Sequence, residues 1–79
     1  MERLETTDLF RAGSLLCLGA RLGEVRRNKG QVTFCLQGDE LTDRDQDYRL
    51  GRTRIEPLQF RQTLNLLRDM IFRGGHHGN

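Results

Sequence analysis

The stretch ARLGEVRRNKGQVTFCLQ, residues 20–37, decides the fold of this 79-residue chain. Two extended segments flank the tripeptide NKG at residues 28–30, and a turn of this kind between two such segments is typical of a β-hairpin. In the second segment Val32, Phe34 and Leu36 occupy alternate positions, so their side chains share one face of a strand. We therefore predict an antiparallel hairpin whose apolar face packs against the protein core.

The first segment of this hairpin contains a break in the alternation. Leu22 and Val25 have opposite parity, so their side chains would point to opposite faces of a regular strand. A β-bulge at Gly23 would return both side chains to the core face, because a bulge places two residues opposite one. The sequence therefore predicts a bulge at this glycine.

A helix is expected before the hairpin, within the segment DLFRAGSLLCL at residues 8–18. Thr6 or Thr7 would supply the N-cap hydroxyl, and Gly19 would end the helix. Gly13 either weakens this helix or lets another backbone approach it closely. The apolar stripe of the helix would comprise Leu9, Phe10, Ala12, Leu15 and Leu16.

Two shorter elements are expected after the hairpin. Residues 39–51 predict a short helix that Asp39 caps and Gly51 ends, with a solvated acidic loop as the alternative. The segment RTRI at residues 52–55 indicates a short third strand, which would complete a small sheet.

The C-terminal helix has the clearest start signal in the chain. Glu56 occupies the N-cap position and Pro57 the first helical position, while Ile55 and Phe60 are placed to form a hydrophobic staple. We expect this helix to run to about Arg73, before a Gly-Gly pair. Its buried stripe would comprise Phe60, Leu64, Leu67 and Ile71, with Leu58 and Met70 alongside.

Together these elements predict an α+β fold in the order α-β-β-α-β-α, in which helices cover a small antiparallel sheet made of the hairpin and the third strand. A chain of 79 residues has no room for a second core. We therefore expect a single compact domain at residues 1–73 and a flexible C-terminal tail at residues 74–79.

The sequence offers no arrangement typical of catalysis or metal binding. Both histidines lie in the expected tail, and Ser14 lies within a helix, where no base is positioned beside it. Asp43, Asp45 and Asp47 match the first ligand positions of a calcium loop, but Tyr48 stands where that loop requires glycine. We therefore expect no enzyme activity, no metal and no cofactor.

Charge is segregated along the chain, although the net charge is only +2. Residues 21–30 hold four basic groups and one acid, residues 49–54 hold three arginines, and residues 39–47 hold five acids. Twelve of the thirteen basic residues are arginine, which suits bidentate contacts with carboxylate or phosphate, unless codon composition explains the bias. The candidate binding surface comprises Arg26, Arg27, Lys29, Arg49, Arg52 and Arg54.

Three interpretations of the basic hairpin tip stay open. It is a solvated turn, a contact for a polyanion such as nucleic acid, or a contact for an acidic protein partner. Aromatic groups for stacking on single strands are not apparent, because the four phenylalanines are needed for the core. Arg52 and Arg54 would extend the basic patch if the third strand pairs beside the hairpin, or would instead pair with the acids of residues 39–47.

The chain shows no signal for export or for membrane insertion. Its N-terminus carries three acids and no apolar core, and its longest apolar run, LLCL, is far below membrane-spanning length. Cys17 and Cys35 resemble small buried hydrophobic residues of a reducing compartment, with a disulfide between them as the alternative. We therefore expect a cytoplasmic protein without membrane contact.

The motifs TTDLF, LLCLGARL and VTFCL, with the spaced Tyr, Gly, Ile, Pro and Phe that follow, span residues 6–72. Together they resemble a family of short prokaryotic and phage proteins that is catalogued only as a domain of unknown function. The resemblance supports the predicted elements and implies a bacterial or mobile-element origin, but it implies no activity. Cys35 and the acidic residues 39–47 are peculiar to this chain. The recurring family positions match Thr7, Asp8, Gly19, Phe34, Tyr48, Gly51, Pro57, Phe60 and Leu67.

These observations favour a small non-enzymatic interaction module that binds a protein partner, as a homodimer or as a subunit of a larger complex. A phage or mobile-element origin would suit an accessory or inhibitor of a host system. The alternative is a nucleic-acid-binding module that uses the basic hairpin and the arginine-rich third strand.

Overall fold

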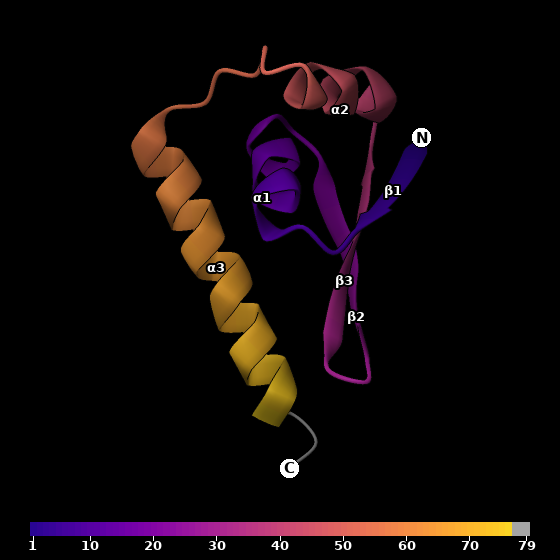
Figure 1. Cartoon of the computed structure of the whole chain (residues 1–79), viewed down its shortest axis with the longest axis vertical. Helices are drawn as coiled ribbons and strands as arrows, with labels where there is room; N and C mark the ends of the chain where they lie inside the picture. The colour runs from indigo at the N-terminus through magenta and orange to yellow at the C-terminus, as the bar shows by residue number, and fades with distance from the viewer. Residues whose placement is uncertain (77–79) are drawn as a thin grey trace.

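A computed structural model describes the backbone of residues 1–76 and the side chains of residues 1–72 (Figure 1). The predicted α+β class and the small antiparallel sheet are confirmed. The predicted order is wrong, because the chain begins with a strand and residues 50–56 form none. The elements are β1 (Glu2–Thr6), α1 (Leu9–Cys17), β2 (Arg21–Asn28), β3 (Gln31–Gly38), α2 (Leu41–Arg49) and α3 (Pro57–His76).

The hairpin of β2 and β3 closes as the sequence predicts. Lys29 and Gly30 have positive φ angles of 54° and 85°, and a two-residue turn of the type common in hairpins requires positive φ at both positions. The pairing register shifts between Leu22 and Glu24, which confirms the predicted bulge at Gly23. The bulge keeps the apolar residues of both strands on the core face.

The third strand is β1, not the segment at residues 52–55. β1 pairs antiparallel with β3, with Leu4 opposite Leu36 and Thr6 opposite Phe34, and the strand order is β1-β3-β2. Both edges of β3 are therefore occupied. Residues 52–55 belong instead to the connection that runs from α2 to α3 at the other end of the molecule from the hairpin tip (Figure 1).

α1 lies between the sheet and α3 and contacts both, and it also packs against α2 (Figure 1). Gly13 permits this arrangement, because a Cβ atom there would lie 2.8 Å from Leu64 Cδ2 and 3.4 Å from Phe60 Cε1. Side chains of α3 therefore approach the backbone of α1 at this glycine, whereas the sequence suggested the approach of another backbone. The core consists of Ala12, Leu15, Phe34, Leu36, Leu41 and Leu67.

The start of α1 differs from the prediction. Its N-cap is Asp8, whose Oδ1 accepts hydrogen bonds from the backbone N–H groups of Phe10 at 2.9 Å and Arg11 at 3.2 Å. Thr6 instead accepts a hydrogen bond from the Asp8 N–H through its hydroxyl, at 3.1 Å. The predicted end is confirmed, since Gly19 follows the helix with a φ of 107°.

α2 confirms the predicted short helix over the acidic segment, and Gly51 follows its end with a φ of 72°. The predicted cap at Asp39 is wrong. The N-cap residue is Glu40, which makes no side-chain cap, and the backbone N–H of Thr42 donates to Glu2 Oε1 of β1 at 2.6 Å. A strand residue distant in sequence therefore satisfies the helix start.

α3 begins as predicted. The Glu56 carboxylate accepts hydrogen bonds from the N–H groups of Leu58 at 3.0 Å and Gln59 at 2.8 Å, which is the geometry of an N-cap. The helix extends to His76, beyond the predicted end at Arg73, and residues 77–79 of the predicted tail lie outside the described residues.

The predicted buried stripe of α3 is only partly buried. Leu64 and Leu67 are buried, but Phe60 and Ile71 are half-buried, and Leu58 and Met70 are exposed. Over the part of the chain that the structure describes, no helix combines the length and the apolar character needed to cross a membrane.

Candidate binding groove

The three basic residues predicted at the hairpin do not point the same way. Arg26 lies opposite Thr33 and Arg27 lies opposite Val32, and neighbouring residues of a strand face opposite sides of a sheet. Arg26 is further committed to an ion pair with Glu5, at 2.5 Å. Hydrogen bonding to that carboxylate raises the pKa of the Arg26 guanidinium. Of these three residues, Arg27 and Lys29 therefore have no ion-pair partner among the described residues.

The other three predicted residues lie at the opposite end of the molecule. Arg49 is near the end of α2, where its Nε lies 3.4 Å from Asp45 Oδ2. Arg52 and Arg54 are exposed on the connection between α2 and α3, and neither has an ion-pair partner within residues 1–72. The connection therefore presents two closely spaced guanidinium groups that have no ion-pair partner within residues 1–72.

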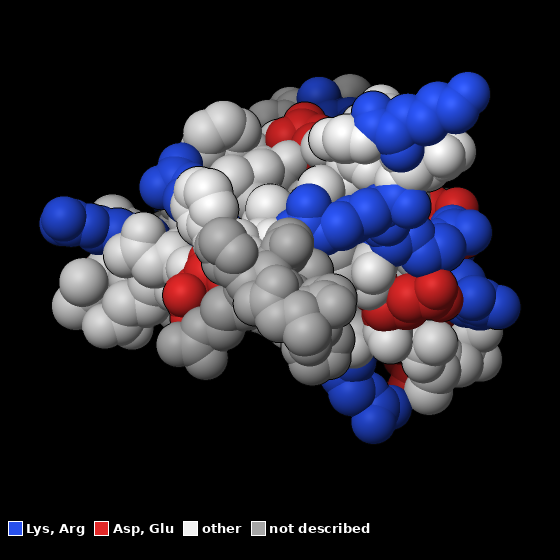
Figure 2. Space-filling model, turned by 90° about the horizontal axis from the view of Figure 1, so that it is seen from below, with Lys and Arg blue, Asp and Glu red and all other residues white. Residues whose placement is uncertain are grey.

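The two basic regions do not form one surface. The hairpin tip lies at one end of the molecule and the connection at the other (Figure 1). Figure 2 is viewed from the hairpin end, and on its right side Lys and Arg side chains gather with acidic side chains among them. The expected extension of the hairpin patch by Arg52 and Arg54 required a strand at residues 52–55, and the structure has none there.

Three of the five acids of residues 39–47 lie on α2, and Asp39 and Glu40 form the turn before it. Asp45 is buried and accepts two hydrogen bonds from Arg11 of α1, from Nε at 2.6 Å and from the terminal nitrogen at 2.5 Å. These hydrogen bonds lower the pKa of Asp45 most, burial opposes them, and the charges of Arg11 and Arg49 lower it further. Asp45 therefore serves to fasten α2 to α1, and no group of potential metal ligands occurs among the described residues.

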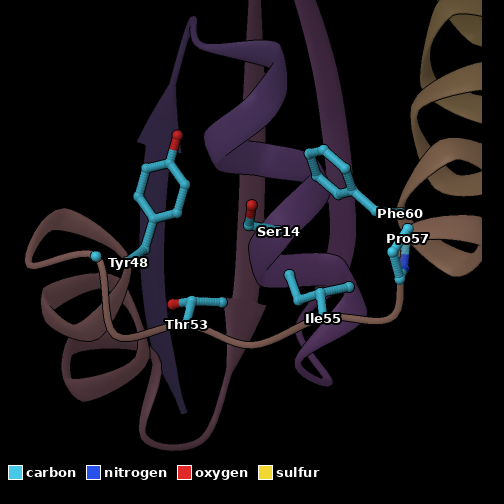
Figure 3. Close-up of a pocket in the computed structure, with 7 residues that line it drawn as sticks. Ser14, Tyr48, Thr53, Ile55, Pro57 and Phe60 are labelled. Carbon is cyan, nitrogen blue, oxygen red and sulfur yellow. The ribbon is translucent and has the colours of Figure 1, made fainter.

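A groove of about 410 Å³ lies between α1, the end of α2, the start of α3 and the connection that joins α2 to α3 (Figure 3). α1 forms its back, the connection between α2 and α3 forms its floor, and aromatic side chains from α2 and α3 stand on either side. Its volume is within the range of ligand-binding clefts. The lining residues are Ser14, Tyr48, Gly51, Thr53, Ile55, Pro57 and Phe60.

The connection is extended and alternates like a strand without pairing as one. Thr53 and Ile55 are half-buried and point toward α1, whereas Arg52 and Arg54 are exposed (Figure 3). Gly51, with its positive φ of 72°, lets the chain leave α2 and turn under α1. The same segment therefore lines the groove with one set of residues and sets two arginines beside it with the other.

Two aromatic rings face the groove from opposite sides. Tyr48 extends along one side of Ser14, and the Phe60 ring reaches toward Ser14 from the other (Figure 3). Burial raises the pKa of Tyr48, and the nearby Asp8 carboxylate raises it further, so its phenol is neutral at physiological pH. Phe10 extends the aromatic surface outward, since its ring centroid lies 6.4 Å from that of Phe60 and the residue is 52% exposed.

The groove is uncharged but contains hydroxyl groups. Ser14, Tyr48 and Thr53 are the lining residues that carry a hydroxyl, although the Thr53 oxygen exposes almost no surface, and the lining includes no carboxylate, imidazole, amine or thiol. The hydroxyl of Thr53 is buried and has no hydrogen-bond partner among the residues that the structure describes. An apolar lining with a few hydroxyl groups suits recognition of an apolar group that carries a polar atom. None of the lining residues has an ordinary pKa suited to proton transfer near neutral pH.

Most of this site could not be assigned from sequence. The patterns assign Phe60 to the core, Tyr48 is considered as the residue that breaks a calcium-loop match, and Ser14 is considered only as a nucleophile. The one available signal is the alternation of residues 52–55, which correctly separates the arginines from Thr53 and Ile55.

No family model matches the chain, and neither the curated proteins nor the solved structures contain a match. The resemblance to short prokaryotic and phage proteins therefore stays a hypothesis.

Proposed function

We propose that this protein is a non-enzymatic interaction module that holds a segment of a partner protein in the groove of α1, α3 and the α2–α3 connection. The observation that carries the proposal is the groove itself, with aromatic side chains on both sides and the exposed ring of Phe10 6.4 Å from that of Phe60. Aromatic residues at a concave site are the usual anchors of protein interfaces. A role as an accessory, inhibitor or subunit of a larger assembly is consistent with such a module.

Charge beside the groove indicates the chemistry of the partner. Arg52 and Arg54 are exposed and unpaired within the described residues, and they belong to the segment that lines the floor. Planar guanidinium groups favour bidentate contacts with carboxylates. We infer that the partner segment carries an apolar anchor residue flanked by aspartate or glutamate.

The nucleic-acid alternative has less support from the geometry. A phosphate-binding surface needs several cations that follow the path of one backbone. Here Arg26 is paired with Glu5, Arg27 faces the other side of the hairpin, and the remaining candidates lie at the far end of the molecule. The protein-binding proposal uses the basic residues that the structure leaves unpaired beside a cavity.

A display library of random peptides tests this proposal, because the selection requires no identified partner. Selection on the immobilised protein should enrich peptides with an aromatic or large aliphatic residue next to acidic residues. These peptides should bind a Phe10→Ala variant about tenfold more weakly, because the substitution removes an aromatic contact at the edge of the groove.

Phe72→Ala provides the matched control. Phe72 is also exposed, at 67%, but it lies near the far end of α3, away from the groove. The control should bind the selected peptides like the unmodified protein. The proposal is wrong if no peptide is enriched, or if the enriched peptides bind both phenylalanine variants equally.

A further inference from the structure

We propose that two copies of this chain pair through their β2 strands, antiparallel and about a two-fold axis at Val25, so that two three-stranded sheets join into one. The proposal goes beyond the proposed function, because β2 contributes no residue to the groove. It is carried by an open strand edge and by the order of the charges along that edge.

β2 is the more open of the two edges of the sheet. The strand order is β1-β3-β2, so β2 is paired with a strand on one side only. Among the described residues, β3 is the one element against which β2 packs extensively, whereas β1, the other edge strand, also contacts α1 and α2. An unpaired edge of eight residues presents N–H and C=O groups that can pair with another strand. A second copy of the chain brings the same edge and can pair with it symmetrically.

The hairpin turn determines which residues of β2 direct their backbone outward. Asn28 and Gln31 flank the two-residue turn, so they form a pair that exchanges backbone hydrogen bonds. Pairs of this kind alternate along an antiparallel ladder, so Val25 and Arg27 direct their N–H and C=O groups away from β3. A two-fold axis at Val25 places the outward groups of both Val25 residues opposite each other, so that each N–H donates to the facing C=O.

The charges of β2 select this register over its neighbours. With the axis at Val25, Glu24 lies opposite Arg26 of the second copy, and the symmetry produces this pair twice. An axis at Glu24, Arg26 or Arg27 would instead set that residue opposite its own copy, with like charges facing. Opposite charges directly across two strands stabilise their pairing, and like charges destabilise it. The charged side chains therefore oppose the neighbouring registers and favour the one about Val25.

Arg26 can contact the second carboxylate without leaving its first. One terminal nitrogen of Arg26 lies 2.5 Å from Glu5, and its Nε lies 3.9 Å from Glu24 of the same chain. A guanidinium has five N–H donors, so donors remain for Glu24 of the second copy. The side chains of Arg26 and Glu24 are 48% and 56% exposed, so a second strand can reach both.

Two single variants and their mixture test the pairing. Glu24→Lys brings two cations face to face in the dimer, and Arg26→Glu brings two carboxylates face to face. Sedimentation velocity over a range of concentrations should show a monomer–dimer equilibrium for the unmodified protein. Each variant alone should have a dissociation constant at least about tenfold higher, because the symmetry applies the repulsion twice. An equimolar mixture of the two variants should recover the dimer, since each cation then faces a carboxylate.

Arg27→Glu provides the matched control. It makes the same change of charge on the adjacent residue, which the proposed register sets opposite Gly23 of the second copy. This variant should associate like the unmodified protein, and circular dichroism should show that all three variants are folded. A dimer that forms equally well in Glu24→Lys uses another surface and overturns the proposal, as does a mixture of folded variants that stays monomeric.

Hydrogen exchange of the unmodified protein tests the same pairing without a substitution. The Val25 N–H faces away from β3, so its exchange should slow as the protein concentration rises and the second strand covers it. The Arg26 N–H is directed to β3 and should exchange at a rate that does not depend on concentration. Exchange of the Val25 N–H that is independent of concentration would overturn the proposal. The peptide-binding groove is unaffected by either result, because it lies on other elements.

Discussion

Asp45 shows at the scale of one residue how the groove is held in place. Its carboxylate is 6% exposed and receives both hydrogen bonds from Arg11, which lies on the neighbouring helix. Tyr48 follows on the same helix and forms one side of the groove. The ion pair therefore sets the position of an aromatic side chain that we expect to contact the partner.

Replacing Asp45 by asparagine should lower the free energy of unfolding by about 2–3 kcal/mol at pH 7, because it leaves the half-buried Arg11 without its charged partner. Urea unfolding measures this difference. Asp47→Asn, an exposed residue on the same helix with no ion pair among the described residues, should change stability by less than about 0.5 kcal/mol. Equal effects of the two substitutions would contradict a structural role for the Asp45 ion pair.

The same ion pair predicts how stability depends on pH. The pKa of Asp45 is lowered from its ordinary value of 3.8, chiefly by the hydrogen bonds from Arg11, so the folded state favours the ionised carboxylate. Its contribution is therefore fully present well above pH 3.8 and is lost as pH falls through 3.8 toward the lower folded-state pKa. Urea unfolding at a series of acidic pH values should show a shallower loss of stability in Asp45→Asn than in the unmodified protein. Parallel curves would rule out this linkage.

At the scale of the element, α1 depends on a cap that differs from the expected one. Asp8→Ala removes the acceptor for the N–H groups of Phe10 and Arg11 and should cost about 1 kcal/mol. Asp8→Asn keeps an acceptor and should cost less. Thr7 is exposed and caps no N–H in the structure, so Thr7→Ala should leave the urea midpoint nearly unchanged. A larger loss of stability in Thr7→Ala than in Asp8→Ala would support the predicted threonine N-cap instead.

Two consecutive leucines of α3 test which face of the helix is buried. Leu67 is 1% exposed and belongs to the core, so Leu67→Ala should lower the free energy of unfolding by about 2–4 kcal/mol. Leu66 is 63% exposed, so Leu66→Ala should change it by less than about 0.5 kcal/mol. Thermal or urea unfolding of both variants measures the difference, and the reverse order would mean that α3 is rotated about its axis.

The elements that sequence predicts well are those whose signals are local. The hairpin follows from alternation and a turn with a glycine, the bulge follows from a parity break, and the start of α3 follows from Glu56 and Pro57. β1 was missed because its partner, β3, is about thirty residues away and its own alternation of Leu4 and Thr6 with charged residues is short. Strand pairing of this kind depends on tertiary context, which also left residues 52–55 extended but unpaired.

The candidate site likewise combines a feature that lies within one segment with a feature built from segments distant in sequence. The sequence nominates Arg52 and Arg54 as candidate binding residues because charge is visible in one segment. It could not identify the groove, because Ser14, Tyr48, Thr53 and Phe60 come from four separate parts of the chain. The sequence interpretation also placed the basic residues of the hairpin and of the connection on one surface, although these regions lie at opposite ends of the molecule (Figure 1).

At the scale of the whole molecule, this separation of the two basic regions distinguishes the two binding hypotheses. Arg52→Ser with Arg54→Ser should weaken the binding of the selected acidic peptides, and the loss should be larger at low salt than at moderate salt because it is electrostatic. Replacing Arg26, Arg27 and Lys29 by serine should leave peptide affinity unchanged. It should also leave the thermal midpoint nearly unchanged, because a hairpin tip contributes little packing.

Fluorescence anisotropy with a labelled peptide at two salt concentrations measures the first effect, and gel shifts with DNA and RNA measure the competing one. Nucleic acid binding through the hairpin would fall steeply with salt and would be lost in the triple serine variant but not in the double one. The peptide proposal expects the reverse, since only Arg52 and Arg54 stand beside the groove. Because the two variants alter different ends of one small domain, a loss of binding in only one of them identifies the surface that carries the function.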